Sequence, residues 1–369
     1  MISRKAAAIG GSVLLLASVG LYYGLSRPEA PSAALPPPAP RPAIAAVPKG
    51  ATAVVTFDLK ELRASPLAAP YLAGERTIEG LGRIRDACGF DPLTMVNELV
   101  LAVPEAFDAE FGMAATGTFG DGPVVDCATK VIGSRGGRPV SSSVGSFRTV
   151  RDVESPSSGE IAVRPGGPLL FGGGGYLRAM IDAVDGSLAA LEGGDPHLAL
   201  RTELAGHDTI TVTIVLSKKQ REVVAQELAA AGGAAPAPIG AVASAAAGLS
   251  LQGNTAKLRV VVACDDPGSA ASLLALAEEA KRNAAASKPA LLLGAEPLLA
   301  RLSVETRGPR LIASVDASVE EIETIIDRAM KVRALLEAQR AMPAPDAPTA
   351  SASAPAAPSA APTASARPR

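Results

Sequence analysis

Few residues of this sequence have the types and the spacing that catalysis or metal binding requires. The two histidines, His197 and His207, are ten residues apart and form no H-E-x-x-H motif. Two imidazoles without further ligands rarely hold a catalytic metal ion. The G-x-S-x-G and S-x-x-K motifs of serine nucleophiles do not occur either. We therefore expect no catalytic and no metal-binding residues, and interpret both histidines as surface or junction residues.

A run of four glycines, Gly172 to Gly175, lies between a predicted strand and a predicted helix. Backbone N–H groups at such a turn can bind phosphate. However, the run belongs to neither a G-x-x-x-x-G-K-[ST] nor a G-x-G-x-x-G motif, and a turn that needs positive φ angles explains it equally well. We therefore expect no cofactor, with phosphate binding as the alternative.

Three cysteines, Cys88, Cys127 and Cys264, are too few and too scattered for a disulfide scaffold or a zinc cluster. In an oxidising compartment Cys88 and Cys127 could form a disulfide; alternatively, Cys127 is a buried thiol on an apolar helix face. Cys264 precedes Asp265 and Asp266. We interpret this acidic pair as a helix cap, with metal binding as the alternative.

The N-terminal region has the layout of a membrane anchor. A basic stub, residues 1–5, precedes twenty apolar or small residues, 6–25, which as a helix would be about 30 Å long and cross a bilayer core. The positive charges predict that the stub stays inside. A proline-rich linker follows at 26–49 and is expected to be extended. A cleaved signal peptide is the alternative.

The long region that follows has mixed helical and strand patterns, which predicts an α+β fold. Its two parts, residues 50–190 and 191–340, are predicted to be a tandem repeat, because both suggest the order β-α-β-β-α-β-β-α, the first with one extra helix. The β-α-β-β-α-β portion is typical of ferredoxin-like antiparallel sheets. The predicted strands are 53–58, 98–103, 113–119, 143–150, 161–171, 209–216, 247–252, 257–264, 299–306 and 311–315; the predicted helices are 59–68, 76–88, 123–132, 176–184, 217–231, 267–286 and 318–339.

The turns from strand to helix carry capping residues, which supports the predicted order. Capping boxes are predicted at Asp58, Ser217 and Ser318, each three residues before Glu or Gln. Acidic caps are predicted at Asp121 and Asp266, each close to a proline that can begin a helix.

Composition restricts the partners. The net charge is −2, aromatic residues are 3% and Trp is absent, which argues against nucleic-acid binding. Residues 341–369 repeat Ala, Pro, Ser and Thr and are predicted to be a disordered tail. The layout resembles that of single-anchored envelope proteins of bacteria with GC-rich genomes, a resemblance that carries no site residues.

We therefore expect a single-pass protein of the bacterial inner membrane whose folded part faces the periplasm. Its expected role is binding or scaffolding, with envelope proteins or the cell wall as partners. Two alternatives stay open: an envelope hydrolase with an acidic cleft between the two halves, and a cell-wall spacer.

Overall fold

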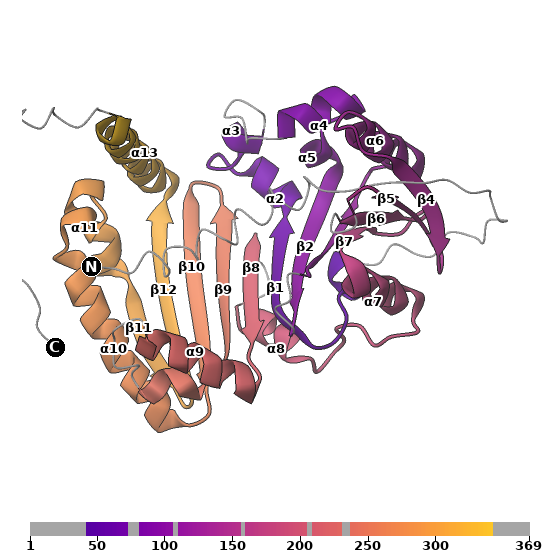
Figure 1. Cartoon of the computed structure of the whole chain (residues 1–369). Helices are drawn as coiled ribbons and strands as arrows, with labels where there is room; N and C mark the ends of the chain where they lie inside the picture. Colours follow the sequence, from indigo (N-terminus) through magenta and orange to yellow (C-terminus); the bar gives the residue numbers. More distant parts are fainter. Residues whose placement is uncertain are drawn as a thin grey trace, which may run out of the picture. The chain divides into compact units, whose positions relative to one another are not determined.

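The folded part of the chain is built on one antiparallel β-sheet. The computed structural model describes residues 42–72, 81–105, 110–155, 159–204, 209–230 and 237–341. Twelve strands of these residues lie in the order β11-β12-β10-β9-β8-β1-β2-β3-β7-β6-β5-β4 (Figure 1). Their bounds are β1 Ala51–Asp58, β2 Val96–Pro104, β3 Gly112–Gly117, β4 Pro139–Val144, β5 Phe147–Asp152, β6 Glu160–Val163, β7 Leu169–Gly172, β8 Ile210–Val215, β9 Val242–Gln252, β10 Thr255–Cys264, β11 Ser303–Arg307 and β12 Arg310–Ser318.

Helices follow half of the twelve strands, namely β1, β3, β7, β8, β10 and β12. Residues up to Ile325 form one compact unit, and those from Ile326, within the last helix, a second. The helical elements are η2 Ala43–Ala46, α2 Leu59–Ala64, α3 Ala69–Leu72, α4 Leu81–Cys88, α5 Pro92–Met95, α6 Asp121–Gly133, α7 Gly174–Asp185, α8 Pro196–Glu203, α9 Lys218–Ala230, η3 Ala237–Ala241, α10 Pro267–Ala285, α11 Lys288–Leu293, α12 Glu296–Arg301 and α13 Val319–Ala341.

The predicted α+β fold with an antiparallel sheet is confirmed, whereas the ferredoxin-like arrangement is not. In a split βαβ unit the chain crosses over a strand and returns parallel to the first one. Here helices α2 to α5 instead bring the chain back directly beside β1, and β1 and β2 pair antiparallel, with Val55 opposite Leu101. The sheet grows outward from the central β1–β8 pair: β2, β3 and β7 follow on one side, and β9, β10 and β12 on the other.

Three predicted strands differ from the structure because a turn or a helix interrupts them. The predicted strand 143–150 is the hairpin of β4 and β5, whose turn contains Gly145 at φ +54°. The predicted strand 161–171 is the hairpin of β6 and β7, whose turn contains Gly166 at φ +65°. Residues 299–306 contain the end of α12 before β11 begins.

The predicted helix caps are largely confirmed. Ser217 and Ser318 form reciprocal capping boxes with Gln220 and Glu321. The Asp58 and Asp266 carboxylates accept hydrogen bonds from backbone N–H groups three residues later. The acidic cap at Asp121 is wrong, because α6 begins at Asp121 itself, two residues before the predicted start at residue 123, and its N-cap is Gly120.

The folded body begins inside the predicted linker 26–49. Ala43, Ala46 and Val47 are buried, and the Ala43 N–H donates to the Glu98 carboxylate at 2.8 Å. The predicted stub 1–5, the predicted span 6–25 and nearly all of the predicted tail 341–369 lie outside the described residues. None of the described helices is both long and apolar enough to cross a bilayer.

The two faces of the sheet are covered differently. Helix α7 and η2 pack on one face of the first part, around Val100, Ala114 and Leu170. Helix α8 covers the same face of the second part through Leu200 and Leu204. On the opposite face, α6 packs over β5 to β7, and α2, α3 and the start of α13 cover one end of β1, β8 and β9.

Candidate functional site

His197 lies in the core at the junction between β1 and β8, and it is 3% exposed. Its Nε2 lies 2.8 Å from the Ala51 carbonyl oxygen and its Nδ1 2.7 Å from the Thr213 hydroxyl. Because a carbonyl only accepts, Nε2 donates to Ala51. Both ring nitrogens are therefore used by the fold, which leaves neither for a metal ion or a substrate. His207 lies outside the described residues.

The rest of the β1–β8 junction is lined with hydroxyl groups rather than carboxylates. Thr56 and Thr211 are opposite each other, both are buried, and their hydroxyls share a hydrogen bond. Gln220 of α9 donates to the Thr52 hydroxyl at 2.8 Å. In the part of the chain that the structure describes, no three His, Cys, Asp or Glu side chains are grouped to hold a metal ion.

The glycine run is a helix start whose N–H groups already have a partner. Glu110 is placed at the N-terminus of α7 and accepts hydrogen bonds from the backbone N–H groups of Gly175 and Tyr176, at 3.3 and 3.0 Å. Gly174 has φ +48°. The chain's own carboxylate thus occupies the position that a phosphate would take. The four glycines form the turn that leads into α7.

Cys264 and the two aspartates after it have separate structural roles. Asp266 caps α10, and hydrogen bonds from the side chain and then the backbone of Ser269 lower its pKa. Asp265 pairs with Arg221 of α9 at 2.6 Å. Burial, together with these two carboxylates, raises the pKa of the Cys264 thiol. A thiol kept protonated in this way is a poor nucleophile.

Cys88 and Cys127, the pair proposed from the sequence, are joined by a disulfide bond. It connects the end of α4 to the middle of α6, and the two Cα atoms are 4.6 Å apart. Both helices pack beside each other. The bond therefore fixes the segment that follows β1 against the helix that follows β3.

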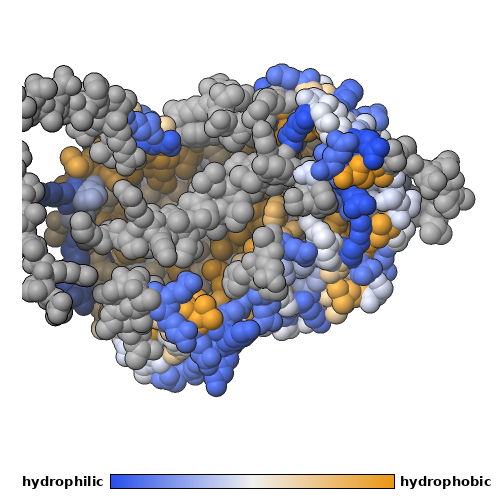
Figure 2. All heavy atoms as spheres, in the orientation of Figure 1, coloured by the Kyte–Doolittle hydropathy of each residue, from blue (hydrophilic) through white to orange (hydrophobic). Residues whose placement is uncertain are grey.

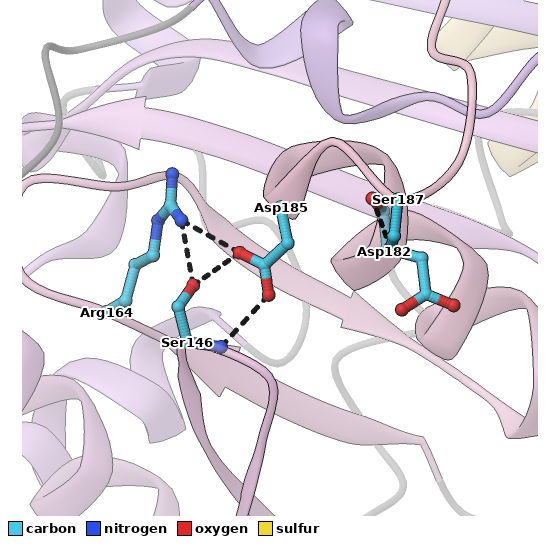
Figure 3. Close-up of polar contacts among 5 residues, drawn as sticks. All are labelled: Ser146, Arg164, Asp182, Asp185 and Ser187. Carbon is cyan, nitrogen blue, oxygen red and sulfur yellow. Dashed lines mark hydrogen bonds and ion pairs between the residues drawn. The ribbon is translucent and has the colours of Figure 1, made fainter.

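Sequence reasoning missed a polar cluster at one end of the β4–β5 hairpin (Figure 3). The Ser146 hydroxyl and N–H donate to the Asp185 carboxylate at 2.5 and 3.0 Å, and Arg164 Nη1 lies 2.8 Å from the hydroxyl and 3.1 Å from the carboxylate. The guanidinium also stacks over Phe147. These contacts tie the hairpin, the end of β6 and the C-terminus of α7 together. Without an imidazole to accept a proton, the arrangement fits a structural clamp better than a nucleophile.

The feature with the clearest potential for binding is one face of the central strands, which we call the apolar face. Residues that lie opposite each other on neighbouring antiparallel strands point to the same side of the sheet, so the strand register determines which residues belong to the apolar face. They form three rows across β1, β8, β9, β10 and β12: Phe57, Ile210, Leu249, Leu258 and Val315; Val55, Val212, Ala247, Val260 and Ala313; and Ala53, Ile214, Ala245, Val262 and Leu311.

The apolar face is incompletely covered. Val55 and Leu311 are buried, Leu258 is 40% exposed, and the remaining members are half-buried. By contrast, Val54 and Val261, which point to the other side of β1 and β10, are 1% and 0% exposed. Figure 2 shows hydrophobic residues gathered in a recess over these strands, with hydrophilic residues along its lower rim.

Helices surround this recess without closing it. Phe57, Ile210 and Leu249 pack against the cluster of α2, α3 and the start of α13 at one end. Helix α9 contacts β9 at the other end, and α10 contacts β11 and β12 at the side. The middle row belongs to none of the hydrophobic clusters of the described residues. An apolar surface left open in this way is typical of an interaction site.

Comparisons with known proteins do not assign a function. No protein-family model and no curated protein matches the chain. Among solved structures, crystal form III of TP0453 is 14% identical, covering 80% of this chain and 99% of that one, with a TM-score of 0.42. Crystal form IV of TP0453 is 13% identical, covering 77% and 95%, with a TM-score of 0.44. A likeness this weak supports no argument about the site.

Proposed function

We propose that the chain is a membrane-tethered binding protein of the bacterial envelope, and that the apolar face is where it binds an apolar ligand. The observation that carries this proposal is the half-exposed middle of that face. Side chains of a sheet core are normally covered by a second layer. Here Val212, Ala247 and Val260 keep contact with solvent, although Thr213, Ala246 and Val261 on the other side of the same strands are buried.

The tether and the location come from the sequence pattern. The apolar segment 6–25 would hold the chain in the inner membrane, and the basic stub before it would keep the folded part outside the cytoplasm. A disulfide between Cys88 and Cys127 is compatible with an oxidising compartment. Protease added to spheroplasts should digest the folded part; full protection would contradict the proposed location.

The binding role is tested by placing charge on the apolar face. In the full chain in mild detergent, Val260→Glu should reduce the fluorescence of bound anilinonaphthalene sulfonate at least fivefold, because a carboxylate in the middle row opposes apolar binding. Lys257→Glu, on the other face of the same strand, is the matched control and should leave the signal unchanged. Circular dichroism checks that both variants fold. Equal binding by both variants would refute the proposal.

The two alternatives lack a supporting observation among the described residues. A hydrolase would need acidic groups that converge in a cleft between the halves, whereas the junction is a pair of hydrogen-bonded strands lined by threonines. A cell-wall spacer would depend on the tail at 342–369, which lies outside the described residues.

A further inference from the structure

The three rows of the apolar face differ in the size of their side chains. The row that contains Phe57, Leu249 and Leu258 has large side chains, whereas the middle row has only valines and the alanines Ala247 and Ala313. The middle row is therefore the floor of a shallow groove, which the large first row borders on one side; on the other side, where the third row has the small Ala53 and Ala245, helix α9 contacts β9. Val55 at the β1 end is buried, so the open part of the groove runs from β8 to β12 and, with neighbouring strands about 4.8 Å apart, is about 14 Å long.

The strand residues of the three rows offer no hydrogen-bonding side chain, which restricts what can lie on them. Every member of the three rows is aliphatic or aromatic without a polar atom. An extended peptide would bring backbone N–H and C=O groups that need partners. A hydrocarbon chain has no such groups and no charge. The acyl chains of one bilayer leaflet, which is about 15 Å deep, are about as long as this groove.

The predicted tether brings the groove within reach of such chains. Leu25, the end of the predicted span, and Ala43, the first helical residue of the folded body, are eighteen positions apart in the sequence. At about 3.1 Å per residue, an extended linker of this length reaches about 55 Å. The folded body can therefore touch the bilayer surface to which it is anchored.

We propose that the groove formed by the middle row of the apolar face binds an acyl chain of a phospholipid taken from the membrane. This inference rests on the proposed binding function and names its ligand. The acyl chain lies across the strands from β8 to β12 on the floor of Val212, Ala247, Val260 and Ala313. The lipid headgroup stays in water, so the chain length and not the headgroup determines affinity.

Site-specific photo-crosslinking in living cells tests the ligand directly. A benzophenone amino acid replaces Leu258, which borders the groove and is 40% exposed, in the full membrane-tethered chain. The matched control carries the same amino acid at Lys257, the preceding residue, which is exposed on the opposite face. After irradiation, mass spectrometry of the purified protein should find phospholipid adducts at position 258, at least tenfold more than at position 257.

The other outcomes separate the two proposals. A protein adduct at position 258 in place of lipid would overturn the acyl-chain inference but leave binding at the apolar face intact. No adduct at position 258, or equal lipid adducts at both positions, would contradict both. A second variant, Ala247→Leu, fills the floor of the groove and should lower the lipid adduct at position 258 about tenfold. An unchanged yield in that variant would overturn the inference.

A chain-length series provides an independent readout. Burial of one methylene group is worth about a fourfold gain in affinity. Binding of lysophospholipids by the reconstituted full chain should therefore tighten about fourfold per methylene, and stop improving once the acyl chain fills the groove. Affinity that follows the headgroup, with chain length irrelevant, would overturn the inference.

Discussion

Replacing His197 with Phe should destabilise the fold although the ring volume is nearly kept. The substitution removes the hydrogen bond to the Ala51 carbonyl at 2.8 Å and the one to the Thr213 hydroxyl at 2.7 Å. The residue opposite Ala51 in β2 is Pro104, which has no N–H to offer. The Thr213 hydroxyl can still donate to the Val54 carbonyl at 3.3 Å.

The cost follows from these partners. One buried carbonyl left without a donor costs about 1–3 kcal/mol, and the loss of the Thr213 bond adds about 1 kcal/mol, so we expect a total of about 2–4 kcal/mol. Urea unfolding of the full chain in detergent, followed by circular dichroism, measures the change. Thr202→Ala, at an exposed position of the same helix α8, is the control and should stay within about 0.5 kcal/mol.

A double-mutant cycle tests whether the two side chains act together. Thr213→Val alone leaves Nδ1 of His197 without a partner, whereas His197→Phe with Thr213→Val leaves neither side chain unpaired. The double variant should therefore be more stable than the sum of the single effects predicts, by about 1 kcal/mol. A change of less than about 0.5 kcal/mol in His197→Phe, or strict additivity, would refute the reasoning.

Three other perturbations test the remaining structural arguments. Gly145→Ala should lower the free energy of unfolding in urea by about 1.5–3 kcal/mol more than Gly253→Ala does. Both glycines have positive φ, but only at Gly145 does an added Cβ collide with Asp185 and disturb the charged hydrogen bonds of that carboxylate. Asp266→Ala should lower the melting temperature near neutral pH but not at about pH 2. The pKa of Asp266 is lowered in the folded protein, so its carboxylate stabilises the fold above the unfolded pKa of about 3.9, and this stabilisation is lost as the pH falls through the folded pKa. An equal change in melting temperature at both pH values would contradict this. Cys88→Ser should cost about 4 kcal/mol, given the 39-residue separation from Cys127, and dithiothreitol should then have no further effect on stability.

The local parts of the structure could be predicted from the sequence, because their causes lie within a few residues. The caps at Ser217, Ser318 and Asp266 each depend on a partner three residues away. The split of the predicted strand 161–171 also had a local signal, since Pro165-Gly166-Gly167-Pro168 is a strong turn sequence.

The candidate site could not be predicted in the same way, because long-range pairing creates it. The rows of the apolar face exist only once β1 pairs with β8, which places Val55 beside Val212. In β8 the alternation of threonines with Val212 and Ile214 predicts that the apolar side chains are covered, whereas the structure buries Thr211 and Thr213 and leaves Val212 and Ile214 half-buried. Likewise, Glu110 reaches the N-terminus of α7 from 65 residues away in the sequence. No local pattern distinguishes that carboxylate from any other exposed glutamate.

The position of β1 at the centre of the sheet has a consequence for how the chain is made. During synthesis β1 can pair with β2, but its other partner, β8, begins only at Ile210. Until then β1 is a bare edge with unpaired backbone groups, a template for association with other chains. A fragment that ends at residue 190 should therefore form oligomers in size-exclusion chromatography. The edge of β1 stays open until β8, which ends at Val215, is available to pair with it.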